Sequence, residues 1–73
     1  MNQPAIGKLI RDLRVESGLT QEQFATRLGV VYSTVNRWEN GHAQPSPLAR
    51  KRIKRKLLSM GEMGQQLLAR YSS

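Results

Sequence analysis

Several residue types and patterns are scarce in this sequence, and each absence excludes a class of protein. There is no cysteine and only one histidine, so neither a disulfide framework nor a thiolate metal site can form, and His42 alone cannot build a zinc site. No stretch approaches the ~18 apolar residues of a membrane span, and the N-terminal segment lacks an apolar run of signal-peptide length. We therefore expect a soluble cytoplasmic protein with no metal, no cofactor and no membrane partner.

The groups needed for catalysis are not found in combination. The five acidic residues are scattered, no nucleophile is accompanied by a base, and no glycine-rich loop has nucleotide-binding spacing. His42 falls in an expected turn, where a loop residue or a phosphate neighbour is a better interpretation than a general base. The sequence predicts that the protein is not an enzyme, and no catalytic residue is assigned.

Length and charge indicate a small domain with a polyanionic partner. With 73 residues, the chain allows one domain, 1–73, whose single core must use every apolar face. Residues 1–46 contain five basic and four acidic side chains, whereas residues 47–73 contain seven and one. A basic protein with this asymmetry is expected to bind nucleic acid or an anionic membrane surface. The alternative is that the basic run is only a solvated helix face.

The clearest local signals lie in residues 19–41, where two short helices flank one glycine. Thr20 and Gln23 have the spacing of a capping box, which predicts the start of a helix over 21–28. Gly29 is suited to the left-handed conformation that ends a helix abruptly. Two helices joined by such a turn have the plan of a helix-turn-helix.

The second helix of this stretch, 32–40, has one apolar and one polar face. Val35 and Trp38 fall on the apolar side, and Gly41 suits the C-terminal stop. The opposite side carries four hydrogen-bonding side chains: Tyr32, Ser33, Asn36 and Arg37. A helix of this length fits the major groove of DNA, where Arg favours guanine and Asn favours adenine.

Three further helices are expected around this pair. An apolar stripe from Ile6 to Leu13 predicts a helix near 5–17, and Ser46 followed by Pro47 predicts a helix near 47–60. A fifth helix near 62–70 is weakened by Gly64. The predicted fold is all-α, a compact arrangement of four to five helices.

This pattern resembles the phage Cro and repressor type of helix-turn-helix, also called the XRE type. The matching residues, in register, are Gln21, Ala25, Gly29, Val35 and Trp38-Glu39-Asn40-Gly41. The resemblance covers roughly residues 5–47 and implies a compact phage-repressor fold with its helix-turn-helix at 21–40. It implies a sequence-specific regulator of transcription, a repressor, that binds double-stranded DNA as a homodimer and associates with the nucleoid.

The resemblance also implies roles for individual residues. Base reading is assigned to Tyr32, Ser33, Asn36 and Arg37, and phosphate binding to Gln21, Asn40, Gly41 and His42. Independently of the resemblance, the basic run of the helix near 47–60 makes Arg50, Arg52 and Arg55 candidates for additional phosphate contacts. Structural roles are assigned to Ala25, Gly29, Val35, Trp38 and a pair between Arg14 and Glu39. Val31 stands where family members usually carry Ser or Thr, so the helix after it lacks a side-chain cap.

Two other functions remain open at this point. In the first, the domain is an antitoxin-type interaction module that binds a partner protein and autoregulates its operon. A long apolar extension would favour this function, and only the short tail from Met63 to Tyr71 is available. In the second, the helix near 47–60 is an amphipathic anchor for anionic membrane or RNA. The lack of aromatic residues between Pro47 and Gln66 argues against that anchor.

Overall fold

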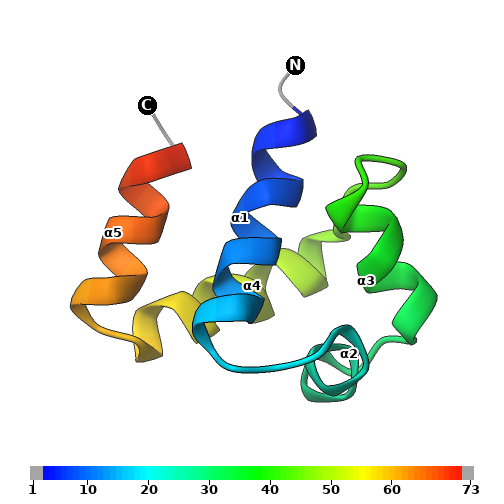
Figure 1. Ribbon diagram of the computed structural model, residues 1–73, viewed down its shortest axis with the longest axis horizontal. Coiled ribbons are helices and arrows are strands. Elements are labelled where there is room, and N and C mark those ends of the chain that lie inside the picture. Colours follow the sequence, from blue (N-terminus) through cyan, green and yellow to red (C-terminus); the bar gives the residue numbers. More distant parts are fainter. Residues whose placement is uncertain (1–2, 72–73) are drawn as a thin grey trace.

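The computed structural model describes residues 3–71, which form five helices and, within that range, no strand. The helices are α1 (Gln3–Glu16), α2 (Gln21–Leu28), α3 (Tyr32–Glu39), α4 (Pro47–Ser59) and α5 (Glu62–Tyr71) (Figure 1). The predicted all-α fold is confirmed. No helix in this range is both long enough and apolar enough to cross a membrane.

The predicted helix ends need small corrections. α1 begins at Gln3 rather than near residue 5, because a proline in the first turn removes no intrahelical hydrogen bond. α1, α3 and α4 each end one residue earlier than predicted; Asn40 and Met60 are cap residues rather than helical ones. α5 runs one residue further, to Tyr71.

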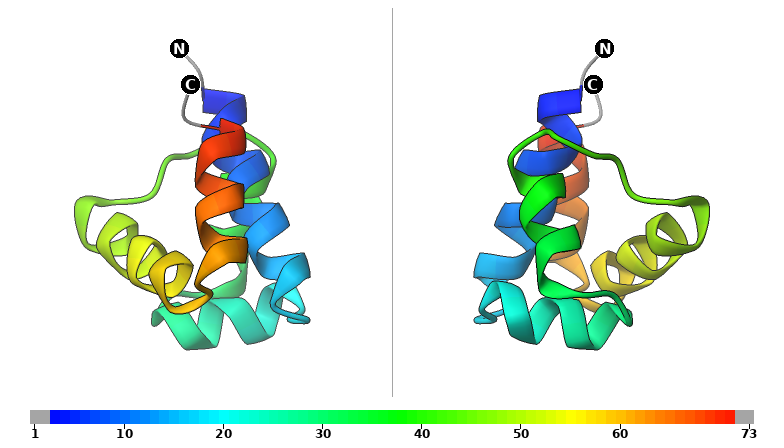
Figure 2. Two further views of the ribbon diagram at one scale, coloured as in Figure 1. Left: turned by 90° about the vertical axis from the view of Figure 1, so that its left-hand side faces the viewer. Right: turned by 90° about the vertical axis from the view of Figure 1, so that its right-hand side faces the viewer.

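α1 occupies the centre of the molecule. It packs against α3 on one side and α5 on the other, and both neighbours run in the opposite direction to it (Figure 1). α2 crosses one end of this layer, and α4 lies across its back, in contact with α5 and α2 (Figure 2). This arrangement leaves one side of α3 uncovered.

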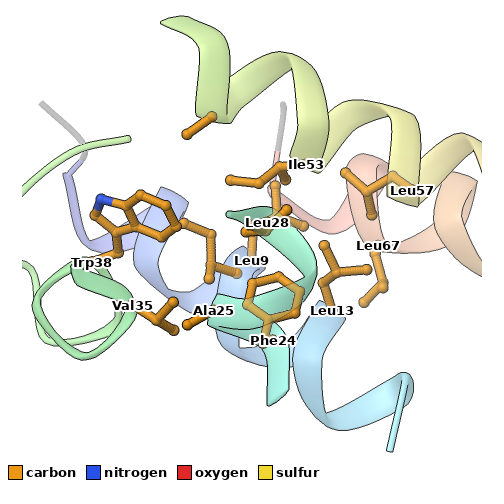
Figure 3. Close-up of a cluster of buried hydrophobic side chains, with 12 residues drawn as sticks. Leu9, Leu13, Phe24, Ala25, Leu28, Val35, Trp38, Ile53, Leu57 and Leu67 are labelled. Carbon is orange, nitrogen blue, oxygen red and sulfur yellow. The ribbon is translucent and has the colours of Figure 1, made fainter. Parts of the chain in front are cut away.

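Every helix contributes to one apolar core (Figure 3). Its buried residues are Leu9, Ile10, Leu13, Phe24, Ala25, Leu28, Val35, Trp38, Ala49, Ile53, Leu57 and Leu67. Within the described residues no polar or charged residue is buried with them. Because burial of apolar surface is the main favourable term in folding, this cluster fixes how α2 and α3 sit on α1.

Two glycines allow the helix backbones to approach closely. A β-carbon on Gly7 of α1 would lie 2.5 Å from the carbonyl oxygen of Trp38 in α3. A β-carbon on Gly64 of α5 would lie 1.8 Å from the carbonyl oxygen of Leu57 in α4. Gly64, which weakened the sequence prediction of α5, is therefore the residue that lets α5 pack.

Candidate nucleic-acid interface

The connection between α2 and α3 is a helix-turn-helix with a well-formed first helix. The Thr20 hydroxyl accepts a hydrogen bond from the Gln23 N–H at 3.1 Å, and Gln23 Oε1 accepts one from the Thr20 N–H at 2.9 Å. Gly29 takes the left-handed conformation with φ 74°, and Val30 then donates its N–H to the Ala25 carbonyl at 3.0 Å. These bonds satisfy the N–H groups of Thr20 and Gln23 at the start of α2 and a carbonyl at its end, and they fix the angle at which the chain enters α3.

α3 buries one face and exposes the other. Val35 and Trp38 are 0% and 3% exposed, so the indole belongs to the core and is not available to stack on a base. Tyr32, Ser33 and Arg37 are exposed on the other side. Val31 precedes the helix with no side-chain cap, as the sequence predicts.

Asn36 differs from the other three predicted base readers because it is half-buried and both ends of its amide are bonded within the protein. Its Nδ2 donates to Gln21 Oε1 at 3.3 Å and to the Tyr32 hydroxyl at 3.2 Å, and its Oδ1 accepts from Asn40 Nδ2 at 2.6 Å. The sequence spacing of four between Tyr32, Asn36 and Asn40 is the signal that could have indicated this row. An adenine could bind the Asn36 amide only after displacing some of these partners.

Gln21 connects the start of α2 to the end of α3. Its Nε2 donates to Glu39 Oε1 at 3.0 Å, and its Oε1 accepts from Asn36. Both ends of the amide are thus used within the protein. The backbone N–H groups of Gln21 and Glu22 have no acceptor within residues 3–71, and the first turn of a helix favours an anion at such groups.

Arg14 and Glu39 are paired as the resemblance implies. Arg14 Nε and Nη2 donate to the two carboxylate oxygens at 2.7 and 3.1 Å, and Nη1 donates to the Leu19 carbonyl at 3.0 Å. The two side chains are only 16% and 5% exposed. This ion pair ties α1 to the end of α3 and holds the carboxylate that Gln21 contacts.

The segment after α3 offers side chains rather than backbone amides to a phosphate. Gly41 has φ 77°, its N–H bonds to the Trp38 carbonyl at 3.2 Å, and the His42 N–H bonds to the Arg37 carbonyl at 2.8 Å. The Asn40 N–H bonds to the Asn36 carbonyl. The predicted phosphate contacts at Asn40 and His42 must therefore come from the amide and the imidazole, and Gly41 contributes the shape of the turn.

The three arginines of α4 considered for phosphate binding lie in different surroundings. Arg50 donates from Nε to the Pro45 carbonyl at 3.2 Å and from Nη2 to Gln44 Oε1 at 2.9 Å. Arg52 donates to the Leu28 carbonyl at 2.7 Å and so caps the end of α2. Arg55 makes no side-chain hydrogen bond or ion pair within residues 3–71, and it lies near Arg27 and Lys56.

The part of the chain that the structure describes holds no cluster of three or more His, Asp or Glu residues suited to a metal ion. The candidate site that the geometry supports is the polar face of α3. Its charged and amide groups suit hydrogen bonding to base edges and phosphates.

Comparison with known proteins decides the family. The profile of the Helix-turn-helix family matches residues 10–51. The chain belongs to this family. A protein from Methanothermobacter thermautotrophicus with the name "Uncharacterized HTH-type transcriptional regulator" is 47% identical over 49 residues, which are 67% of this chain and 71% of the relative. No solved structure matches the chain significantly.

The match spans the second half of α1, the whole helix-turn-helix and the start of α4. It confirms the resemblance to the Cro and repressor type, and together with the relative it supports a DNA-binding regulator of transcription. Proteins of this family are generally not enzymes. The roles of individual residues in DNA binding stay predictions.

Proposed function

We propose that the protein is a sequence-specific repressor of transcription that acts in the cytoplasm, on nucleoid DNA, and reads the major groove with α3. The observation that carries this proposal is the uncovered side of α3, with Tyr32, Ser33 and Arg37 exposed and the opposite side anchored by Trp38. α3 has 8 residues and is about 12 Å long, which suits a major groove about 12 Å wide.

Within this proposal, Arg37 and Ser33 read bases directly. Arg37 is exposed, and its one side-chain hydrogen bond within residues 3–71 runs from Nη2 to the His42 carbonyl at 3.5 Å, the limit for a hydrogen bond. Ser33 is exposed and makes no side-chain hydrogen bond within residues 3–71. Tyr32, 48% exposed, offers a hydroxyl and an apolar ring at the start of α3. Asn36 contributes to reading only by exchanging its internal partners for an adenine.

Phosphate contacts are proposed on both sides of α3. On one side are the N–H groups at the start of α2, held in place by the bonds from Gln21 to α3. On the other side are Asn40 and His42, with Gly41 shaping their turn, and Arg50 next to the loop that follows. Such contacts position a protein on DNA, whereas the base contacts specify the site.

Homodimeric binding is part of the same proposal. One α3 contacts too few base pairs for a unique genomic address, and family members dock as dimers on half-sites about 10 base pairs, or about 34 Å, apart. The repressor role rests on the resemblance to phage Cro and repressor proteins. The name of the relative supports regulation of transcription but does not distinguish repression from activation.

Selection of bound duplexes from a random library tests the proposal. We expect a palindromic consensus, a sedimentation mass of two chains per duplex, and lower output of a reporter whose promoter overlaps that consensus. Arg37→Ala should relax the consensus at one base position in each half-site, whereas Arg11→Ala, at an exposed arginine on α1, should leave it unchanged. Absence of any consensus would exclude sequence-specific binding. Increased reporter output would show that the protein activates transcription rather than repressing it.

A further inference from the structure

Val31, the residue immediately before α3, exposes an apolar side chain at the start of the proposed reading helix. It is 66% exposed, the largest exposed fraction among the large apolar side chains of residues 6–71. The connection from α2 to α3, which contains Val31, lies at the lower right of the molecule in Figure 1. A ligand that meets the start of α3 would remove this apolar group from water, which is favourable.

The capping of α3 does not explain why valine stands at this position. The hydroxyls of Thr20 and Ser46 accept backbone N–H groups at the starts of α2 and α4. Val31 has the extended backbone of a cap residue, and its carbonyl accepts the Thr34 N–H at 3.0 Å, but its side chain forms no capping bond. Valine is among the least favourable residues at an N-cap. Contact with a ligand accounts for Val31 better than helix stability does.

A hollow next to Val31 has little to hold a phosphate. It lies between α2 and the start of α3, has a volume of about 520 Å³, and is lined in part by Val31, Tyr32 and Thr26. Among the residues that line it within the described chain, Glu22 is the only charged one, and none is basic. A phosphate here would meet a carboxylate without a cation, whereas an uncharged base edge would not be repelled.

Tyr32, the other exposed apolar residue at this place, is bonded towards the middle of α3. Its hydroxyl accepts a hydrogen bond from Asn36 Nδ2 at 3.2 Å. Because Asn36 lies one helical turn further along α3, this bond directs the hydroxyl end of the ring along the helix. Val31 therefore supplies the exposed aliphatic group at the very start of α3.

We propose that Val31 contacts the 5-methyl group of a thymine and so adds one base preference to each half-site. This inference rests on the proposed binding of α3 in the major groove. In helix-turn-helix proteins, the residues at the start of the second helix meet the base edges. The thymine methyl is the one apolar group that the four bases present in the major groove, and apolar side chains contact it. Hydrogen bonds from Ser33 or Arg37 cannot detect it.

Replacing thymine by deoxyuridine in the preferred duplex tests the contact, because it removes one methyl group and keeps every hydrogen-bonding group. Each thymine of a half-site is replaced in turn, and affinity is measured by fluorescence anisotropy with the full chain. At one position we expect the wild type to bind about fourfold more weakly, as one buried methyl group implies. A chain that selects no consensus would contradict the proposed function itself. A consensus in which no thymine shows this loss would overturn the Val31 contact alone.

Two valine variants show whether Val31 makes the contact. Val31→Ala removes both methyl groups of the side chain, so it should bind the thymine and deoxyuridine duplexes equally. Val15→Ala, at a 56% exposed valine of α1, should keep the full response of the wild type. If Val31→Ala still distinguished the two duplexes, another residue would contact the methyl group and the proposal would be overturned.

Val31→Ser separates base reading from helix stability. The serine hydroxyl can accept an N–H group in the first turn of α3, so the variant should be at least as resistant to urea as the wild type. Its response to deoxyuridine should nevertheless disappear, because the apolar group is gone. A variant that unfolds at the same or higher urea concentration and keeps the wild-type response would show that Val31 does not read a base, and would overturn the proposal.

Discussion

Arg14 and Glu39 are 25 residues apart in sequence and form a two-bond ion pair, with N···O distances of 2.7 and 3.1 Å. The pair lies behind α3, and its carboxylate also accepts the Gln21 amide. The network therefore joins the core side of the helix-turn-helix to the residues beside the proposed DNA-reading face. Its first consequence concerns stability.

Arg14→Met should lower the free energy of unfolding, and its main effect should not be on DNA affinity. The substitution leaves the Glu39 carboxylate, 5% exposed, without its cation. Removing one member of a buried pair costs roughly 3–5 kcal/mol. Urea unfolding measures the loss, with Arg11→Met, at an exposed position of the same helix, as the control. An unchanged unfolding curve with weaker DNA binding would instead make Arg14 a DNA contact.

The sequence predicted the elements that local chemistry determines. Capping by Thr20 and Ser46 and the left-handed turn at Gly29 placed the starts of α2 and α4 and the end of α2 correctly. These signals involve residues within one helical turn of each other, so the sequence alone identifies both partners of each contact. The ion pair of Arg14 was accessible only through the resemblance.

The contacts that the sequence did not reveal join residues distant along the chain. The spacing of Asn36 placed it on the polar face of α3, but its bond to Gln21 depends on how α2 packs. The bond from Arg52 to the Leu28 carbonyl likewise needs α4 to lie beside α2. Helix propensity predicts that Gly64 destabilises α5. In the structure, the absence of a side chain at Gly64 lets α5 pack closely against the Leu57 carbonyl of α4.

Gly64→Ala should destabilise the protein even though alanine favours helix. The new methyl group would lie 1.8 Å from the Leu57 carbonyl oxygen, so α4 and α5 must move apart. Overpacking of this kind costs typically about 1–3 kcal/mol, more than the gain of about 1 kcal/mol in propensity. Denaturant unfolding should show the loss, with the exposed Gln65→Ala as control. Increased stability would contradict the close approach of the two helices.

Stability should fall in alkaline solution as Tyr71 ionises. The Tyr71 hydroxyl donates to Asp12 Oδ2, and this hydrogen bond, with a smaller contribution from desolvation, raises the pKa of Tyr71 above 10.0. A raised pKa in the folded state stabilises the protein below the unfolded value and loses that contribution as pH rises through the folded value.

Comparison of the wild type with Tyr71→Phe tests this linkage. The variant lacks the hydrogen bond, so the wild type should be the more stable of the two near neutral pH. The difference should shrink as the pH rises to about 11, beyond the ordinary tyrosine pKa. Tyr32→Phe, which leaves Tyr71 in place, should keep the alkaline loss. A constant difference between the wild type and Tyr71→Phe over this range would contradict the raised pKa.

The salt dependence of DNA binding should separate the arginines of α4. If Arg50 contacts a phosphate, Arg50→Ser should lower the slope of log affinity against log salt by about 0.9. Arg50→Lys keeps the charge and loses the forked contacts to Pro45 and Gln44, so it should retain most of the slope. Arg11→Ser is the control at an exposed site on α1. The same reduction for Arg55→Ser would place Arg55 on DNA as well.

Arg37 provides the sharpest test of base reading. Among the four predicted readers it is the one long cation, it is exposed, and its contact with the His42 carbonyl is at the hydrogen-bond limit. Its guanidinium can therefore leave that position at little cost and donate two bonds to guanine O6 and N7. Arg37→Ala should leave the unfolding curve nearly unchanged.

On the preferred duplex, Arg37→Ala should weaken binding by about 1–3 kcal/mol and relax the choice at one base position in each half-site. Arg37→Lys retains the charge but not the two-bond geometry, so it should lose the same discrimination while keeping the salt slope. The measurement is a titration of each variant against the preferred duplex, its single-base variants and an unrelated duplex. A phosphate contact does not depend on the base sequence, so an equal loss of affinity on all of these duplexes would show that Arg37 contacts phosphate. Ser33 and Tyr32 would then be the direct readers.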